Sequence, residues 1–172
     1  MTVDGLRRLY DYGYWANRRL FQAMEQMTAE QFTQPVAGSY GSIRNTMVHV
    51  LSAERGWLER CGGPARGPQL KGEDYPTLAS LVSAWAAAEV QLRAFLDGLR
   101  DEDLGRLVEF TIPAFGPACI MPVGELLQHA ATHAVHHRGQ VALLMRLLGY
   151  APGNVDLFIY DLEKRRAGTV TA

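Results

Sequence analysis

Residues 126–148 read LLQHAATHAVHHRGQVALLMRLL, and this stretch decides the fold. Apolar residues recur in it every three or four positions, which is the period of an amphipathic helix, and no proline interrupts it. It also contains four of the five histidines of the chain, which are His129, His133, His136 and His137. A helix that turns several imidazoles inward either binds a metal ion or must supply a hydrogen-bond partner for each buried ring.

Three more segments show the same helical period, and they cover residues 3–27, 43–60 and 77–99. Ser42 is a suitable N-cap for the second of them, and the sequence Gly-Gly-Pro at 62–64 ends it. Four long amphipathic helices, with a long crossover before the last one, are typical of a four-helix bundle. The sequence therefore predicts an all-α protein in which residues 1–172 form a single domain.

Two smaller features lie outside the four long helices. Residues 107–112 alternate apolar and polar side chains like a short strand, 113–117 are typical of a turn, and 118–121 can form a return strand. A small hairpin at 107–121 is therefore predicted. A last short helix at 156–165 is expected to dock through three apolar side chains, Leu157, Phe158 and Leu162.

Composition and charge limit the classes of function. The chain has 172 residues, of which 20% are charged, and its formal net charge is −1, so no basic face for nucleic acid or an anionic membrane is indicated. No apolar run approaches the roughly 18 residues of a transmembrane helix, and Asp4, Arg7 and Arg8 stand where a signal peptide would be apolar. Cys61 and Cys119 have no second cysteine nearby in the sequence, which is typical of thiols in a reducing compartment. A cytoplasmic protein is predicted.

The helical wheel indicates which histidines face the interior, because successive residues are separated by ~100°. From the centre of the apolar stripe, His137 lies roughly 30° away and His133 about 70° away. His129 and His136 lie about 110° and 130° away. Because residues four apart on a helix can bind one ion, His133 and His137 are the predicted ligand pair. His129 and His136 become candidates that support the ligands without binding the ion.

A third ligand must come from elsewhere, since catalytic metal sites usually use three protein ligands. The remaining histidine, His49, lies in the helix 43–60, away from its main apolar stripe and among the small residues Ala53 and Gly56. That face can either approach another helix closely or be exposed. Glu54 lies near the centre of the apolar stripe. A buried carboxyl there must be paired or protonated, so Glu54 is either a proton-handling residue beside the site or an edge residue paired with an arginine.

Several segments resemble the DinB/YfiT-like family of metalloenzymes, and together they span nearly the whole chain. The matching residues are His133–Gln140 (HAVHHRGQ), Glu125–His129, Ser42–Arg44 followed by His49, Glu54 and Trp57, then Tyr14–Asn17 and Asp156–Ile159. The run HHRGQ is the most specific of these. The resemblance implies that His49, His133 and His137 bind a divalent ion, nickel or zinc, in an up-down-down-up bundle, and that the protein is a homodimer.

The wider superfamily of the family that the sequence resembles includes thiol-dependent S-transferases and a mycothiol-dependent maleylpyruvate isomerase. Our first hypothesis is therefore a metal-dependent enzyme with a small-molecule substrate. It either transfers a low-molecular-weight thiol to a small electrophile or hydrolyses its substrate with water activated at the metal. The alternatives are a non-catalytic metal-binding or stress-related homodimer, and a bundle without metal. An open coordination position beside a pocket favours the enzyme, whereas a fourth protein ligand favours a structural role.

Overall fold

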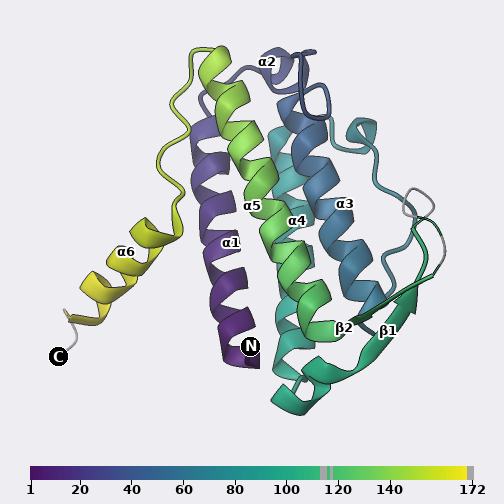
Figure 1. The fold of residues 1–172 in the computed structure, drawn as a ribbon. Coiled ribbons are helices and arrows are strands. Elements are labelled where there is room, and N and C mark those ends of the chain that lie inside the picture. Colours follow the sequence, from purple (N-terminus) through teal and green to yellow (C-terminus); the bar gives the residue numbers. More distant parts are fainter. Residues whose placement is uncertain (113–115, 117, 170–172) are drawn as a thin grey trace.

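The computed structural model describes residues 1–112, 116 and 118–169. Within these residues, four long helices form a bundle (Figure 1): α1 (Val3–Met24), α3 (Ile43–Arg60), α4 (Leu78–Asp97) and α5 (Val123–Leu147). The shorter elements are α2 (Ala29–Thr33), the 3-10 turns η1 (Gly72–Asp74) and η2 (Asp101–Gly105), the strands β1 (Leu107–Phe110) and β2 (Cys119–Pro122), and α6 (Leu157–Thr169). The predicted all-α four-helix bundle is confirmed.

The four helices run up, down, down and up in chain order, as Figure 1 shows. α5 packs between α1 and α3, and α4 contacts both α1 and α3, so the four form a closed ring. The consecutive helices α3 and α4 are parallel, so residues 61–77 return the chain along the length of the bundle between them. The long connection that was predicted before the last helix is present at residues 98–122 and carries the hairpin, but it begins and ends at one end of the bundle.

Local capping explains where the helices begin. The Ser42 hydroxyl accepts a hydrogen bond from the backbone N–H of Asn45 at 3.0 Å, and α3 has the bounds predicted from the sequence. α5 begins at Val123, directly after Pro122, and is therefore one turn longer at its start than the stretch 126–148. The most extensive helix contact is between antiparallel α3 and α5, which carry all five histidines.

The hairpin and the last helix attach to this bundle at opposite sides. β1 pairs antiparallel with β2, and the predicted hairpin is present, but of its turn at 113–117 only residue 116 lies within the described residues. α6 docks on α1 through Tyr160, which is buried and lies 5.6 Å from the ring of Trp15. The prediction that Phe158 docks this helix was wrong, because its side chain is 68% exposed.

No helix in the described part of the chain is long and apolar enough to cross a membrane.

Candidate metal centre

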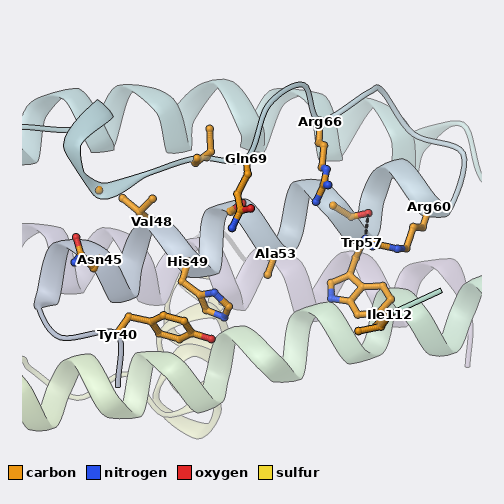
Figure 2. Close-up of a pocket in the computed structure, with 14 residues that line it drawn as sticks. Tyr40, Asn45, Val48, His49, Ala53, Trp57, Arg60, Arg66, Gln69 and Ile112 are labelled. Atoms are coloured by element: carbon orange, nitrogen blue, oxygen red, sulfur yellow. Dashed lines mark hydrogen bonds between the residues drawn. The ribbon is translucent and has the colours of Figure 1, made fainter. Parts of the chain in front are cut away.

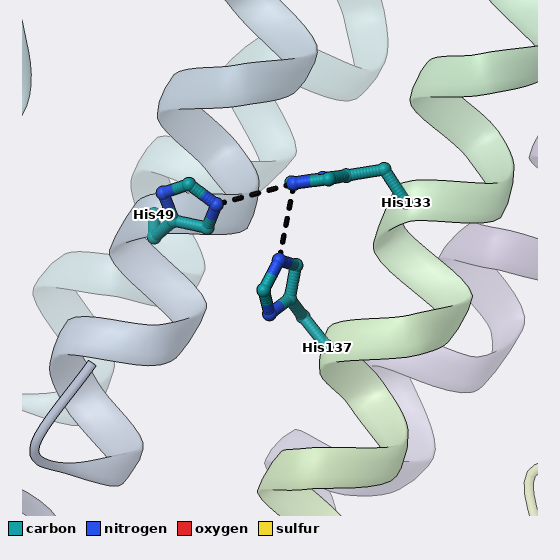
Figure 3. Close-up of side chains that lie close together, drawn as sticks. All are labelled: His49, His133 and His137. Carbon is teal, nitrogen blue, oxygen red and sulfur yellow. Dashed lines mark hydrogen bonds between the residues drawn. The ribbon is translucent and has the colours of Figure 1, made fainter. Parts of the chain in front are cut away.

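Three imidazole rings from two helices converge between α3 and α5, as Figure 3 shows. Nε2 of His133 lies 3.2 Å from Nε2 of His49 and 3.0 Å from Nε2 of His137. One ligand nitrogen from each of the three residues lies within 4.8 Å of the other two. Nitrogens that are each about 2.0–2.1 Å from one zinc ion lie roughly 3 Å apart, so this spacing fits three ligands of a single divalent ion.

The three rings are held in the neutral form that binds a metal. Burial lowers the pKa of His49 to about 4, with a further contribution from the charge of His137. Burial also lowers the pKa of His133 to about 4, and the charges of the neighbouring histidines add to this effect. The pKa of His137 is lowered by burial too. Near neutral pH each ring therefore has a nitrogen lone pair available for a cation.

Gln140 determines how the His137 ring is protonated. Its Oε1 accepts hydrogen bonds from Nδ1 of His137 at 2.6 Å and from Oγ of Ser39 at 2.7 Å. Its amide nitrogen lies 3.1 Å from Nε2 of His136. Because the proton of His137 is on Nδ1, the lone pair of Nε2 is directed at the other two ligands. The wheel analysis of the histidines does not identify Gln140, although its position three residues after a predicted ligand places it within reach of that ligand.

The loop before α3 also belongs to the site. Ser39 has a φ of 49°, in the left-handed region that non-glycine residues rarely adopt. Its hydroxyl donates a hydrogen bond to Oε1 of Gln140 and accepts one from the Thr46 hydroxyl. The next residue, Tyr40, stacks on the His49 ring with the centroids 3.7 Å apart and approaches the His137 ring edge-on at 5.5 Å. Nothing in the periodicity of the sequence marks Tyr40, because a loop residue is positioned only by tertiary structure.

The two remaining histidines of α5 lie beside the three-histidine group. His137 is buried and His133 is half-buried, whereas His129 and His136 are exposed, which is the order that the wheel predicts. The His129 ring packs edge-on against Trp57, with the centroids 4.9 Å apart. His136 contacts Gln140. Both therefore touch the surroundings of the ligands, and their supporting role stays a prediction.

Glu54 lies in the bundle interior, where it faces α1. It is buried and accepts a hydrogen bond from the Tyr14 hydroxyl at 2.6 Å. Burial raises the pKa of Glu54 to about 7, although the Tyr14 hydrogen bond and the charge of Arg138 oppose that shift. Within the described residues no arginine forms an ion pair with Glu54, so its partner is a tyrosine and not the arginine considered from the sequence. Its role in proton handling stays a prediction.

Arg138, in the HHRGQ run, is also buried behind the site. Its Nη1 donates to Oδ1 of Asn17 at 3.3 Å, and its guanidinium lies 5.5 Å from the centre of the Tyr12 ring. Gly13 of α1 lies against this guanidinium, and a Cβ there would be at ordinary contact distance, 3.6 Å from Nη1 of Arg138. Burial lowers the pKa of this guanidinium. Arg138 thus links α5 to α1 immediately after the candidate ligand His137.

A cavity of about 360 Å³ opens beside His49 and runs along α3 (Figure 2). Ala53 and Gly56 lie along it, so the small-residue face around His49 borders an open space and not a tightly packed helix. In residues 1–112, 116 and 118–169, the candidate metal group has three members and no fourth protein ligand. Three protein ligands are typical of catalytic zinc sites, whereas structural zinc sites usually have four.

Comparison with known proteins gives the same fold and family. The chain is 27% identical to Protein DinB of Bacillus subtilis over 162 residues, which covers 89% of this chain and 91% of that protein. It is 22% identical to the B. subtilis protein YizA, over 86% of this chain and 90% of that protein. A crystal structure of a DinB-like protein from Bacillus cereus superposes with a TM-score of 0.73 at 22% identity, covering 90% of this chain and 98% of that one.

A structure of a conserved protein from Enterococcus faecalis also has this fold, with a TM-score of 0.60 at 19% identity, over 86% of this chain and 97% of that one. The family model for DinB proteins matches residues 1–166. This match covers every helix that contributes to the candidate metal centre, and it agrees with the resemblance carried by the HHRGQ run. The chain belongs to the DinB family.

Proposed function

We propose that this protein is a metal-dependent enzyme in which His49, His133 and His137 bind one divalent ion, nickel or zinc. The observation that carries the proposal is the convergence of three neutral imidazoles, one of which, His49, lines an open cavity. A purely structural site would be expected to have four protein ligands and no access for a substrate. The choice of nickel or zinc rests on the family resemblance and on the preference of these ions for imidazole.

The chemistry of the site follows from its donor set. When bound to three neutral ligands, a divalent ion keeps its full charge and lowers the pKa of a coordinated water or thiol. Gln140 holds the His137 ring in the required tautomer, and Tyr40 covers one face of the His49 ring. The cavity beside His49 admits a small molecule. We place thiol transfer to a small electrophile before hydrolysis, because of the relatives that the sequence resembles.

The proposal includes a homodimer in the cytoplasm. Three large apolar side chains are more than half exposed on α5 and α6, and they are Leu143, Leu147 and Phe158. Such side chains are common at subunit interfaces. Sedimentation of the chain as a dimer, and of Phe158→Ser as a monomer or a weaker dimer, would support this assembly. A chain that sediments as a monomer at every concentration would exclude it.

The central experiment is metal analysis of the native protein, followed by a screen of thiols and electrophiles on the metal-loaded form. The proposal expects one nickel or zinc ion per chain and turnover of at least one thiol–electrophile or hydrolysable substrate class. Stoichiometric metal with no turnover of any substrate would favour the alternative, a non-catalytic metal-binding bundle. Protein that carries no metal, and whose melting temperature does not change when nickel, zinc or manganese is added, would be the metal-free bundle.

A further inference from the structure

The cavity beside His49 has a positive end that the metal site alone does not explain. Arg60 and Arg66 line it, and no aspartate or glutamate among the described residues does. Figure 2 shows both arginine side chains beside Trp57, at the end of the cavity away from Tyr40. A ligand in this cavity therefore meets cationic groups at both ends when the three histidines hold a divalent ion.

Arg60, at the end of α3, and Arg66, in the loop that follows, meet over one face of α3. His49, Ala53, Gly56 and Arg60 are separated by three or four residues and so lie on the same side of the helix. A Cβ at Gly56 would lie 3.2 Å from Nη1 of Arg60 and 3.4 Å from Nη1 of Arg66. Both guanidinium groups thus lie over Gly56, whose small size leaves room for them. Two like charges this close repel each other unless an anion shares them.

The positive charge at this end is only partly compensated. The Glu59 carboxylate lies 3.5 Å from Nε of Arg66, and both side chains are exposed enough for water to weaken that pair. Arg60 has no ion-pair partner in the described residues; its Nη1 donates to the Gly56 carbonyl at 3.0 Å, and its guanidinium lies 5.0 Å from the centre of the Trp57 ring. Two guanidinium groups and one carboxylate leave a net positive charge facing the cavity.

The distance between the two ends sets the size of the ligand. His49 and Gly56 are seven residues apart, and a helix rises 1.5 Å per residue, so the two positions are separated by about 10 Å along α3. That length corresponds to about three residues of extended chain. Trp57 at the arginine end and Tyr40 at the His49 end provide aromatic surface against which the ligand can pack.

We propose that this cavity selects a small molecule that carries a carboxylate about 10 Å from the group that binds the metal, with the carboxylate held by Arg60 and Arg66. The inference rests on the proposed function, because it takes the three-histidine site as the anchor of the other end. For the thiol reaction, the expected thiol substrate is therefore an acidic one of about tripeptide size and not a neutral alkyl thiol.

The test compares an acid with an alcohol of equal length on cobalt-loaded protein, where a bound thiolate produces a sulfur-to-cobalt absorption band. Mercaptooctanoate is expected to bind at least about tenfold more tightly than mercaptooctanol, because charge-assisted hydrogen bonds are the stronger kind. The Arg60→Gln/Arg66→Gln double variant should lose this preference while its affinity for mercaptooctanol is unchanged. Mercaptopropionate, which cannot reach the arginines, should show no advantage over mercaptopropanol.

Arg18→Gln/Arg100→Gln is the matched control, because these two side chains are 60% and 74% exposed and lie outside the cavity. It removes the same charge and should keep the preference for mercaptooctanoate. An equal affinity of the parent protein for the acid and the alcohol overturns the inference and leaves the metal site intact. The same conclusion follows if the double variant, with unchanged melting temperature and cobalt content, still prefers the acid.

A separate measurement keeps the inference distinct from the proposed function. If neither thiol produces the cobalt band, thiols do not bind the metal and the proposed thiol transfer is contradicted. The cavity is then tested with octanoate and octanol, which have no thiol. The indole resonance of Trp57, assigned with Trp57→Phe, reports on their binding by NMR. A shift produced by octanoate and lost in the double arginine variant supports the carboxylate site. Equal shifts from both compounds, or none, overturn it.

Discussion

The Oε1 atom of Gln140 lies 2.6 Å from Nδ1 of His137, on the side of the imidazole ring that faces away from the other two candidate ligands. A single amide group therefore decides which ring nitrogen of His137 is free to bind an ion, and it does so from the same helix turn. The contact from the Ser39 hydroxyl to the same oxygen makes this arrangement depend on the loop before α3 as well.

Gln140→Ala should weaken metal binding by about 10–100-fold, because the His137 ring loses the partner that fixes its tautomer and orientation. The measurement is the dissociation constant for zinc or nickel, obtained by competition with a chelator. Gln128→Ala, an exposed glutamine on the same helix, is the matched control and should bind the metal like the parent. Parent-like affinity of Gln140→Ala would show that the amide does not support the ligand.

His133→Ala should abolish stoichiometric metal binding, because His133 lies between the other two rings and contacts both. Metal content after dialysis is the measurement, and it should fall from one ion per chain to none. His129→Ala removes an exposed imidazole from the same helix and should keep the ion. The ligand assignment is wrong if His129→Ala loses the metal and His137→Ala retains it.

Metal should raise the thermal stability of the chain, because the ligand set exists only when α3 and α5 are packed together. At a free zinc or nickel concentration about 100 times the dissociation constant, the expected gain is about 2.7 kcal/mol. For a domain of this size, that gain corresponds to an increase in melting temperature of roughly 5–10 °C. A variant with all three ligands changed to alanine should show no increase, and a similar increase in that variant would place the ion elsewhere.

Glu54→Gln should change how stability depends on pH. The pKa of about 7 in the folded protein exceeds the ordinary value of 4.5, so the folded state holds this proton more tightly than the unfolded state does. The stability that the protonated carboxyl contributes is complete below about pH 4.5 and is lost as the pH rises through about 7. Glutamine cannot lose a proton, so the variant should gain up to about 3 kcal/mol relative to the parent between about pH 5 and pH 8.

Urea unfolding at both pH values measures the Glu54 effect. Glu109→Gln, whose side chain is exposed on β1, is the control and should keep the pH dependence of the parent. A constant difference between Glu54→Gln and the parent across this range would show that burial does not raise the pKa of this carboxyl.

The parts of the fold that follow local rules could be predicted closely. α3 has its predicted bounds because Ser42 caps its start and the Gly-Gly-Pro sequence at 62–64 excludes further helix. The exposure of the histidines on α5 follows the wheel, because a regular helix converts spacing directly into direction. The same spacing placed Glu54 in the interior, where the structure has it.

Features that depend on tertiary contacts could not be predicted in this way. Tyr40 and Arg66 lie in loops, so nothing in the spacing of the sequence indicates that one stacks on His49 and the other faces Gly56. In α6, Phe158 and Tyr160 are equally good docking residues by composition, and the aromatic cluster on α1 selects Tyr160. Which connection returns the chain along the bundle depends on helix direction, and periodicity carries no information about direction.

Residues 61–77 supply part of the cavity wall but none of the candidate metal ligands. The candidate metal ligands come from α3 and α5, whose spacing is fixed by the packed core, whereas Arg66 and other parts of the cavity wall come from the segment that returns the chain to α4. Loops tolerate insertion and substitution far better than packed helices. If the protein is the enzyme proposed above, changes in this one connecting segment can alter which substrate it prefers while the three histidines stay as they are, so residues 61–77 are the natural target for engineering a new specificity.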